Sequence, residues 1–251
     1  MQFRYGKITV KIGSNVLAKS DGTLNVSRIA HLVDQIAFLH KNGVEVVLVS
    51  SGAVAAGKAV LEPAKKIDAV SQRQLWAALG QVKLISRYSD FFSEHGLVCA
   101  QVLTTKENFS SRAHYLNMKN CITTLLENKV IPIVNENDTI SVTELMFTDN
   151  DELSGLMASM VNSEALILLS NVDGVYNSHP QSKNAELINK IEVAEKELEN
   201  AIYSNSDKQA ILIPEFEFYK ELKSNEEEIP IKIIEKKSLK ISSKKEIARQ
   251  L

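Results

Sequence analysis

Hydrophobic positions along this chain follow two alternating patterns. Short runs that are apolar almost throughout lie at residues 7–13, 44–50, 97–103, 129–135 and 165–170, and such runs are typical of strands buried on both faces of a sheet. Between them, apolar residues recur every three or four positions, as on one face of a helix. This spacing predicts helices over residues 27–43, 71–93 and 112–128, and a further helix from about Asp151.

Strands that alternate with helices predict an α/β fold, with a mostly parallel open sheet sandwiched between helices. A hairpin is expected around residues 140–147, and the apolar runs at 210–219 and 229–237 are interpreted as further strands. No internal repeat or low-complexity linker divides the 251 residues. We therefore expect a single domain over residues 1–251.

The amino-acid composition is that of an ordinary soluble protein and excludes few classes of function. The apolar fraction of 44% and the charged fraction of 24% are those of an ordinary soluble protein. The net charge of −2 gives no electrostatic argument for a nucleic-acid or membrane partner. The chain shows no basic-then-apolar leader, and Cys99 and Cys121 have no metal or redox spacing. We expect a cytoplasmic protein with reduced cysteines.

Residues 47–60, "VLVSSGAVAAGKAV", contain the spacing of a P-loop, because Gly52 is followed by Gly57 and Lys58. A P-loop ends in a Ser or Thr whose hydroxyl binds magnesium, whereas position 59 is alanine. The alanines between the two glycines also favour a helix. The pattern therefore predicts a helix that begins just after Ser51 and Gly52, rather than a phosphate-binding loop.

Ligands of open α/β sheets bind beyond the carboxyl ends of the strands, so polar residues there are candidates for the site. Lys11 lies in an otherwise apolar strand, where it either reaches solvent or contacts a phosphate. Ser51 follows the second strand and is either a helix cap or part of an anion-binding turn. Asp138, in "NENDT", suits an ammonium group.

Two further segments add candidates. Asp149 and Asn150 open the helix of "DNDELSG", where acidic residues ordinarily cap a helix but also orient lysines near a polyphosphate. Ser170 and Asn171 end the strand of "LLSNVDGVY", against which a nucleotide could lie.

Several of these segments together carry a resemblance to a known family. "VKIGSNVL", "VSSGAVAAG", "SQRQLWAALGQVKL", "IPIVNENDT", "DNDELS" and "LLSNVDGVY" occur in the order and spacing of glutamate 5-kinases, which belong to the amino-acid kinase superfamily. The chain resembles that family over residues 1–191, and the matching residues begin at about Lys7. Residues 192–251 form an atypical end of the nucleotide-binding half.

The resemblance implies an enzyme that uses ATP and Mg²⁺ to phosphorylate the side-chain carboxylate of L-glutamate. The product is L-glutamyl 5-phosphate, in the first step of proline biosynthesis. It also implies a homo-oligomer, either a dimer or a tetramer, with no nucleic-acid or membrane partner.

Roles for residues follow from the resemblance by position. Lys11 and Asp149 would be catalytic, with Lys11 at the transferring phosphate and Asp149 orienting it. Glutamate would be held by three residues, Ser51, Asp138 and Asn150, and the nucleotide by Lys11, Ser170 and Asn171. No residue is expected to be a metal ligand.

One departure from the family leaves an alternative open. The family has a later segment Gly-Thr-Gly-Gly-Met-x-Thr-Lys, whereas all ten glycines of this chain lie between Gly6 and Gly174. Lys208 is the only positional stand-in for that lysine, and no PUA domain is expected. The alternatives are a catalytically inactive relative that binds glutamate or proline in a regulatory role, and a chain with an aberrant C-terminal end.

Overall fold

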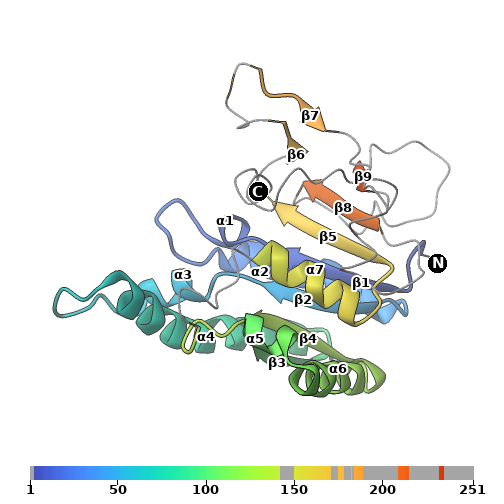
Figure 1. Cartoon of the computed structure of the whole chain (residues 1–251), viewed down its shortest axis with the longest axis horizontal. Coiled ribbons are helices and arrows are strands. Elements are labelled where there is room, and N and C mark those ends of the chain that lie inside the picture. The colour runs from blue at the N-terminus through green and yellow to red at the C-terminus, as the bar shows by residue number, and fades with distance from the viewer. Residues whose placement is uncertain are drawn as a thin grey trace.

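A seven-stranded sheet forms the centre of the fold (Figure 1). The computed structural model describes residues 3–141, 150–170, 175–177, 182, 184–188, 209–214 and 232–234. The strands lie in the order β3-β4-β2-β1-β5-β8-β9, and each adjacent pair is parallel except β8 and β9. Their bounds are β1 (Lys7–Ile12), β2 (Glu45–Ser50), β3 (Val98–Thr104), β4 (Val130–Glu136), β5 (Ala165–Ser170), β8 (Gln209–Pro214) and β9 (Lys232–Ile234). A separate antiparallel pair consists of β6 (Val175–Tyr176) and β7 (Leu187–Ile188).

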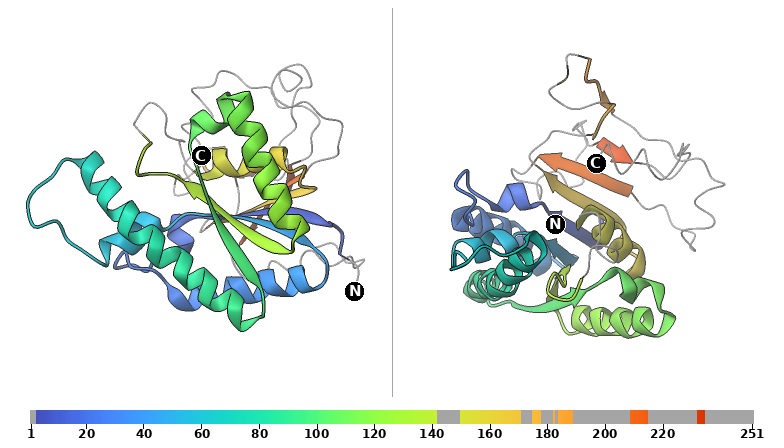
Figure 2. Two further views of the ribbon diagram at one scale, coloured as in Figure 1. Left: turned by 90° about the horizontal axis from the view of Figure 1, so that it is seen from below. Right: turned by 60° about the vertical axis from the view of Figure 1, so that its left-hand side comes forward.

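Helices cover both faces of this sheet, as the left view of Figure 2 shows. One face carries α2 (Val26–Lys41) and α4 (Ala69–Glu94), and the other carries α6 (Arg112–Glu127) and α7 (Asn150–Met160). Short helices follow the ends of three strands: α1 (Ser14–Leu17), α3 (Ala53–Lys58) and α5 (Lys106–Ser110). The predicted fold class is therefore confirmed. No helix in the described part of the chain is long and apolar enough to cross a membrane.

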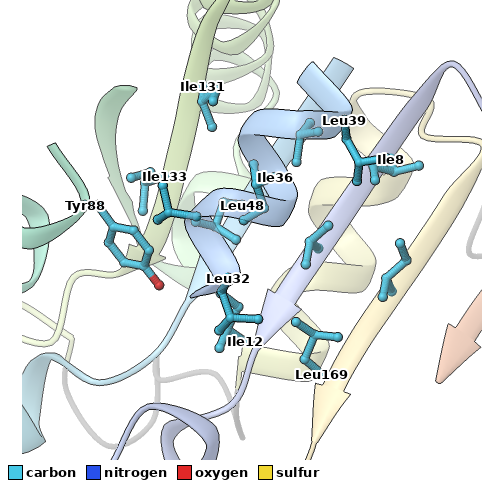
Figure 3. Packing of buried hydrophobic residues seen from close by; sticks show 14 of the residues in the cluster. Ile8, Ile12, Leu32, Ile36, Leu39, Leu48, Tyr88, Ile131, Ile133 and Leu169 are labelled. Atoms are coloured by element: carbon cyan, nitrogen blue, oxygen red, sulfur yellow. The ribbon is translucent and has the colours of Figure 1, made fainter. Parts of the chain in front are cut away.

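The strands bury alternate residues in two hydrophobic cores. Ile8 and Ile12 of β1 pack with α2 and α4 in the larger cluster, together with Leu48 and Leu169 (Figure 3). On the other face, residues such as Val49 pack against α6 and α7. Because the sheet is covered on both sides, its central strands are apolar almost throughout, which is the pattern seen in the sequence.

The predicted helices and strands are present, with small differences at their ends. The helix expected over 71–93 runs from Ala69 to Glu94, because the Asp68 carboxylate accepts hydrogen bonds from the amides of Val70 and Ser71, each 3.0 Å long. The short helices α1 and α5 were not predicted. Strands β8 and β9 confirm the two strands expected near the C-terminus, and the structure shows that both join the sheet. Most of the expected hairpin lies outside the described residues.

Helices α3 and α4 touch through their backbones. A Cβ atom on Gly57 would overlap the carbonyl group of Trp76, and one on Gly80 would overlap the carbonyl oxygen of Ala53. Gly52, which precedes α3, has a φ of +105°, a left-handed conformation that favours glycine. The glycines of the P-loop-like pattern thus serve a turn and a helix contact, which confirms the prediction of a helix after Gly52.

This contact predicts a stability test. We expect Gly57→Ala and Gly80→Ala each to lower the free energy of unfolding by about 2 kcal/mol or more, because the added methyl group meets backbone that cannot move aside cheaply. Gly155→Ala is the matched control, since it lies in α7 with no atom within 4 Å of its Cβ position. It should be neutral or stabilise by about 0.5–1 kcal/mol. Urea unfolding of the three variants measures the difference, and equal effects would disprove the close contact.

Candidate active site

The carboxyl ends of the central strands meet at one edge of the sheet, where loop backbones join them. The amide of Ser51 donates to the carbonyl of Ile12 over 3.1 Å, and the amide of Gly13 donates to the carbonyl of Leu169 over 3.2 Å. These bonds hold the residues after β1 and β2 close to the end of β5. Helix α7 begins at the same edge and supplies its first two residues, Asn150 and Asp151, to the site.

Lys11 is held at this edge by an ion pair. Its neighbours Val10 and Ile12 point into the larger core, so Lys11 points to the face covered by α7. There its Nζ lies 2.5 Å from Oδ1 of Asp151, and only 11% of the lysine side chain is exposed. The partner carboxylate offsets the cost of removing the ammonium group from water. The result is a positioned cation at the end of a central strand.

A chain of amide and hydroxyl groups links α7 to β2, β4 and α4. The side-chain NH₂ of Asn150 donates to Oγ of Ser51 over 2.8 Å and to Oδ1 of Asn135 over 3.0 Å. The NH₂ of Asn135 in turn donates to Oε1 of Gln81 over 3.0 Å. Both protons of the Asn150 amide are therefore used, and the Ser51 hydroxyl, which accepts here, keeps its own proton to donate elsewhere.

The turn after β2 is held in place by the buried phenol of Tyr88 in α4. Oγ of Ser50 donates to the carbonyl of Ser51 over 3.0 Å, and it lies 2.8 Å from the hydroxyl of Tyr88. Because a serine has one proton, Tyr88 must be the donor in the second bond. Burial raises the pKa of Tyr88, so its hydroxyl stays protonated for this role. The turn that carries Ser51 is thus fixed against α4.

The start of α4 also holds the loop after β4. Arg73 donates from Nε over 3.0 Å and from Nη2 over 2.7 Å to the same oxygen, Oδ1 of Asp138. Its Nη2 lies 3.8 Å from Oε2 of Glu136, and the next residue, Gln74, donates to the carbonyl of Thr139 over 3.1 Å. Two consecutive side chains of one helix therefore fix the loop that carries Asp138.

The structure brings together several of the residues expected at the site. Lys11, Ser51 and Asn150 lie within one connected set of contacts through α7, and Asp138 lies on the loop directly after β4, the strand that contains Asn135. Ser170 ends β5 at the same edge. Asp149, Asn171 and Lys208 lie outside the described residues, so their expected roles stay predictions.

Other residues of the site were not assigned a role from the sequence. Asp151 is a carboxylate beside Lys11, and α4 supplies Arg73 and Gln81. A usable signal was present in α4: both residues fall on the helical stripe of the buried Ala77, Leu84 and Tyr88. Polar residues on a buried stripe need hydrogen-bond partners, and here the partners are Asp138 and Asn135 of the candidate site.

Comparison with known proteins identifies the family. The model of the amino acid kinase family matches residues 6–210. The chain belongs to the amino acid kinase family. It is 62% identical over 202 residues to a glutamate 5-kinase of Bacteroides thetaiotaomicron, and 48% identical over 192 residues to one of Chlorobaculum tepidum. The resemblance to glutamate 5-kinases seen in the sequence is thereby confirmed.

These matches have defined extents. They cover 80% and 76% of this chain but only 56% and 53% of the two relatives, so the chain spans about half the length of the curated relatives it matches. A solved structure of isopentenyl phosphate kinase matches with a TM-score of 0.58 at 15% identity, covering 86% of this chain and 95% of that one. At that identity the likeness concerns the fold, which agrees with the sheet described above. Kinases of this family use ATP as the phosphoryl donor.

The polarity of the amide chain gives a prediction for Gln81. Gln81→Glu keeps an oxygen that accepts from Asn135, so the free energy of unfolding should change by less than about 0.5 kcal/mol. Gln81→Leu removes the acceptor and leaves the amide of Asn135, which is 3% exposed, without that partner. We expect a loss of about 1–3 kcal/mol for the leucine variant in urea unfolding. A larger loss for glutamate than for leucine would contradict this polarity.

Proposed function

We propose that this chain transfers the γ-phosphoryl group of ATP to the side-chain carboxylate of L-glutamate, giving L-glutamyl 5-phosphate and ADP. The observation that carries the proposal is that the first two residues of α7 contact two different kinds of group. Asn150 contacts the Ser51 hydroxyl and the next residue, Asp151, holds the Lys11 ammonium group. A hydrogen-bonding site and a cation therefore lie side by side, in a chain that is similar to glutamate 5-kinases over most of its length.

The Ser51 hydroxyl suits a carboxylate-bearing substrate. Ser51 accepts from Asn150, so its proton is directed to a ligand, and a carboxylate oxygen is an acceptor that such a proton would bind. Asp138, with its carboxylate at the next loop, suits the α-ammonium group of the same molecule. We infer that Ser51, Asn150 and Asp138 hold glutamate.

Lys11 suits the phosphoryl group. In the reaction a glutamate carboxylate oxygen forms a bond to the γ-phosphorus of ATP while the bond from that phosphorus to the bridging oxygen breaks and ADP leaves. Transfer of this kind asks the protein for positioning and for neutralisation of charge, not for a protein nucleophile. The ion pair with Asp151 keeps the Lys11 ammonium group at the strand end, where the new charge would develop.

The remaining roles are proposed from the family resemblance. Asp149 would orient Lys11 together with Asp151, and Ser170 and Asn171 would line the nucleotide site. Mg²⁺ would be held mainly by the phosphates of ATP. Within the described residues no group of three or more His, Cys, Asp or Glu side chains could hold a metal ion, and the nearby Glu152 is paired with Lys106 at 2.8 Å. Assembly into a dimer or tetramer and a cytoplasmic location stay predictions.

The C-terminal segment favours one alternative. The family match ends at residue 210, and residues 175–251 contain no glycine with which to build the glycine-rich lysine segment of the family. A protein with an intact amino-acid site and an altered nucleotide site would bind glutamate or proline without turnover. This is the inactive, regulatory relative, and the following experiment separates it from the kinase.

The test measures ADP release by the purified protein with ATP and Mg²⁺, with and without L-glutamate, and traps the acyl phosphate with hydroxylamine. We expect glutamate-dependent release of ADP that Lys11→Ala lowers by about 10²–10³-fold, because a positioned charge is removed. Lys7→Ala is the matched control: Lys7 lies on the same face of β1 but at its other end, 3.0 Å from Glu45. Its variant should keep full activity.

The outcomes separate the two functions. Turnover lost in the Lys11 variant and kept in the Lys7 variant supports the kinase. Thermal stabilisation by glutamate without any turnover supports the inactive relative. Turnover that does not depend on Lys11 would disprove the assignment of this lysine.

A further inference from the structure

The ion pair between Arg73 and Asp138 is an unusual feature for a carboxylate that is to bind a cationic ligand. Asp138 is 9% exposed and already has a cation beside it, whereas the Arg73 side chain is 47% exposed. Arg73 therefore either competes with a ligand for Asp138 or takes part in binding it. The geometry of the pair distinguishes these roles.

The contacts of the pair leave one hydrogen-bonding group free on each partner. Both bonds from Arg73, through Nε and Nη2, end on Oδ1 of Asp138, so Oδ2 remains as an acceptor. Within the described residues, the guanidinium contacts to Asp138 and Glu136 use Nε and Nη2 but not Nη1. Nη1 of Arg73 thus leaves two N–H donors and Asp138 leaves one carboxylate oxygen, on two side chains that are in contact.

The charges of the pair also fit an amino acid, which carries an ammonium and a carboxylate group. Asp138 presents a carboxylate to a cation, and Arg73 presents a guanidinium to an anion. An isolated carboxylate would attract any amine, whereas this pair presents both signs.

We propose that Arg73 is a specificity-determining residue that binds the α-carboxylate of the amino acid while Asp138 binds its α-ammonium group. The proposal rests on the proposed function, because it assigns the α-end of the same substrate. An α-amino acid carries its two charges on one carbon atom, so the matching surface needs a cation and an anion in direct contact. Arg73 and Asp138 are such a pair, with 2.7 Å between Nη2 and Oδ1.

The surroundings keep this pair in place. Gln74 ties the start of α4 to the carbonyl of Thr139, and α4 is itself fixed to α3 by the backbone contact at Gly57 and Gly80. Arg73 and Asp138 therefore sit on segments that Gln74 joins at a further point, and the helix that carries Arg73 is itself anchored to α3. A fixed pair of charges discriminates between ligands more sharply than two mobile ones do.

The test compares ligands that differ at the α-carbon, measured as dissociation constants by calorimetry without ATP. L-Glutamate carries both α-charges, 4-aminobutyrate lacks the α-carboxylate, and glutarate lacks the ammonium group. Arg73→Gln should raise the dissociation constant of L-glutamate by about 10–100-fold, which is the range for a lost hydrogen bond between charged groups. The same variant should change the dissociation constant of 4-aminobutyrate by less than about threefold. Arg87→Gln is the matched control, since Arg87 lies on the same helix and faces Asp90 at the surface; it should change neither ligand.

A second variant covers the case in which the glutamine variant does not fold. Arg73→Lys keeps the charge beside Asp138, but a single ammonium group lacks the planar fork that holds two carboxylates at once. We expect this variant also to lose affinity for L-glutamate but not for 4-aminobutyrate. The melting temperature of each variant without ligand shows whether it is folded.

Each outcome decides the proposal. If the Arg73 variants lose equal affinity for L-glutamate and 4-aminobutyrate, Arg73 only orients Asp138. If they bind both ligands more tightly, Arg73 competes with the ammonium group for Asp138. Either result overturns the inference and leaves the proposed function standing. Wild-type protein that does not bind L-glutamate at all overturns the proposed function and this inference with it.

Discussion

The contact between the backbones of α3 and α4 is the constraint on which the site depends. Gly57 and Gly80 let the two helices approach until no side chain fits between them. Because α3 begins directly after β2, this contact sets α4 across the ends of the strands. Polar residues along one stripe of α4 then reach the carboxyl ends of β2 and β4 and the loop after β4, namely Arg73, Gln74, Gln81 and Tyr88. A helix held farther away by larger side chains would leave those segments unsupported.

The second organising element is the start of α7, which divides the site by chemistry. Asn150 joins neutral hydrogen-bonding groups from β2 and β4, whereas Asp151 joins the charged Lys11 of β1. Consecutive residues at a helix start point in different directions, so one turn of helix serves two regions only a few ångströms apart. This arrangement places neutral hydrogen-bonding groups beside a cation, as the proposed transfer between two substrates requires.

Much of the fold follows from the sequence, because apolar runs and helical spacing report burial directly. The gathering of Lys11, Ser51 and Asn150 at one edge of the sheet was also predictable, since all three follow the rule for strand ends in open sheets. Arg73 and Gln81 were not assigned, because their partners Asp138 and Asn135 lie more than fifty residues away in the chain. Local patterns contain no information on such pairings. The same limit applies to Asp151, whose position in a first helical turn is equally typical of a simple cap.

The C-terminal strands show that the sheet and the phosphate site make different demands on the sequence. Strand β8 pairs in parallel with β5 along its whole length, so that Pro214 lies beside Ser170, although the segment has no glycine. A strand needs apolar residues and backbone pairing, whereas a loop that wraps a phosphate needs glycines to bring its amides close. Extension of the sheet therefore gives no support to nucleotide binding. The proposed amino-acid site, in contrast, draws only on residues between 11 and 151, which lie within the matched part of the chain.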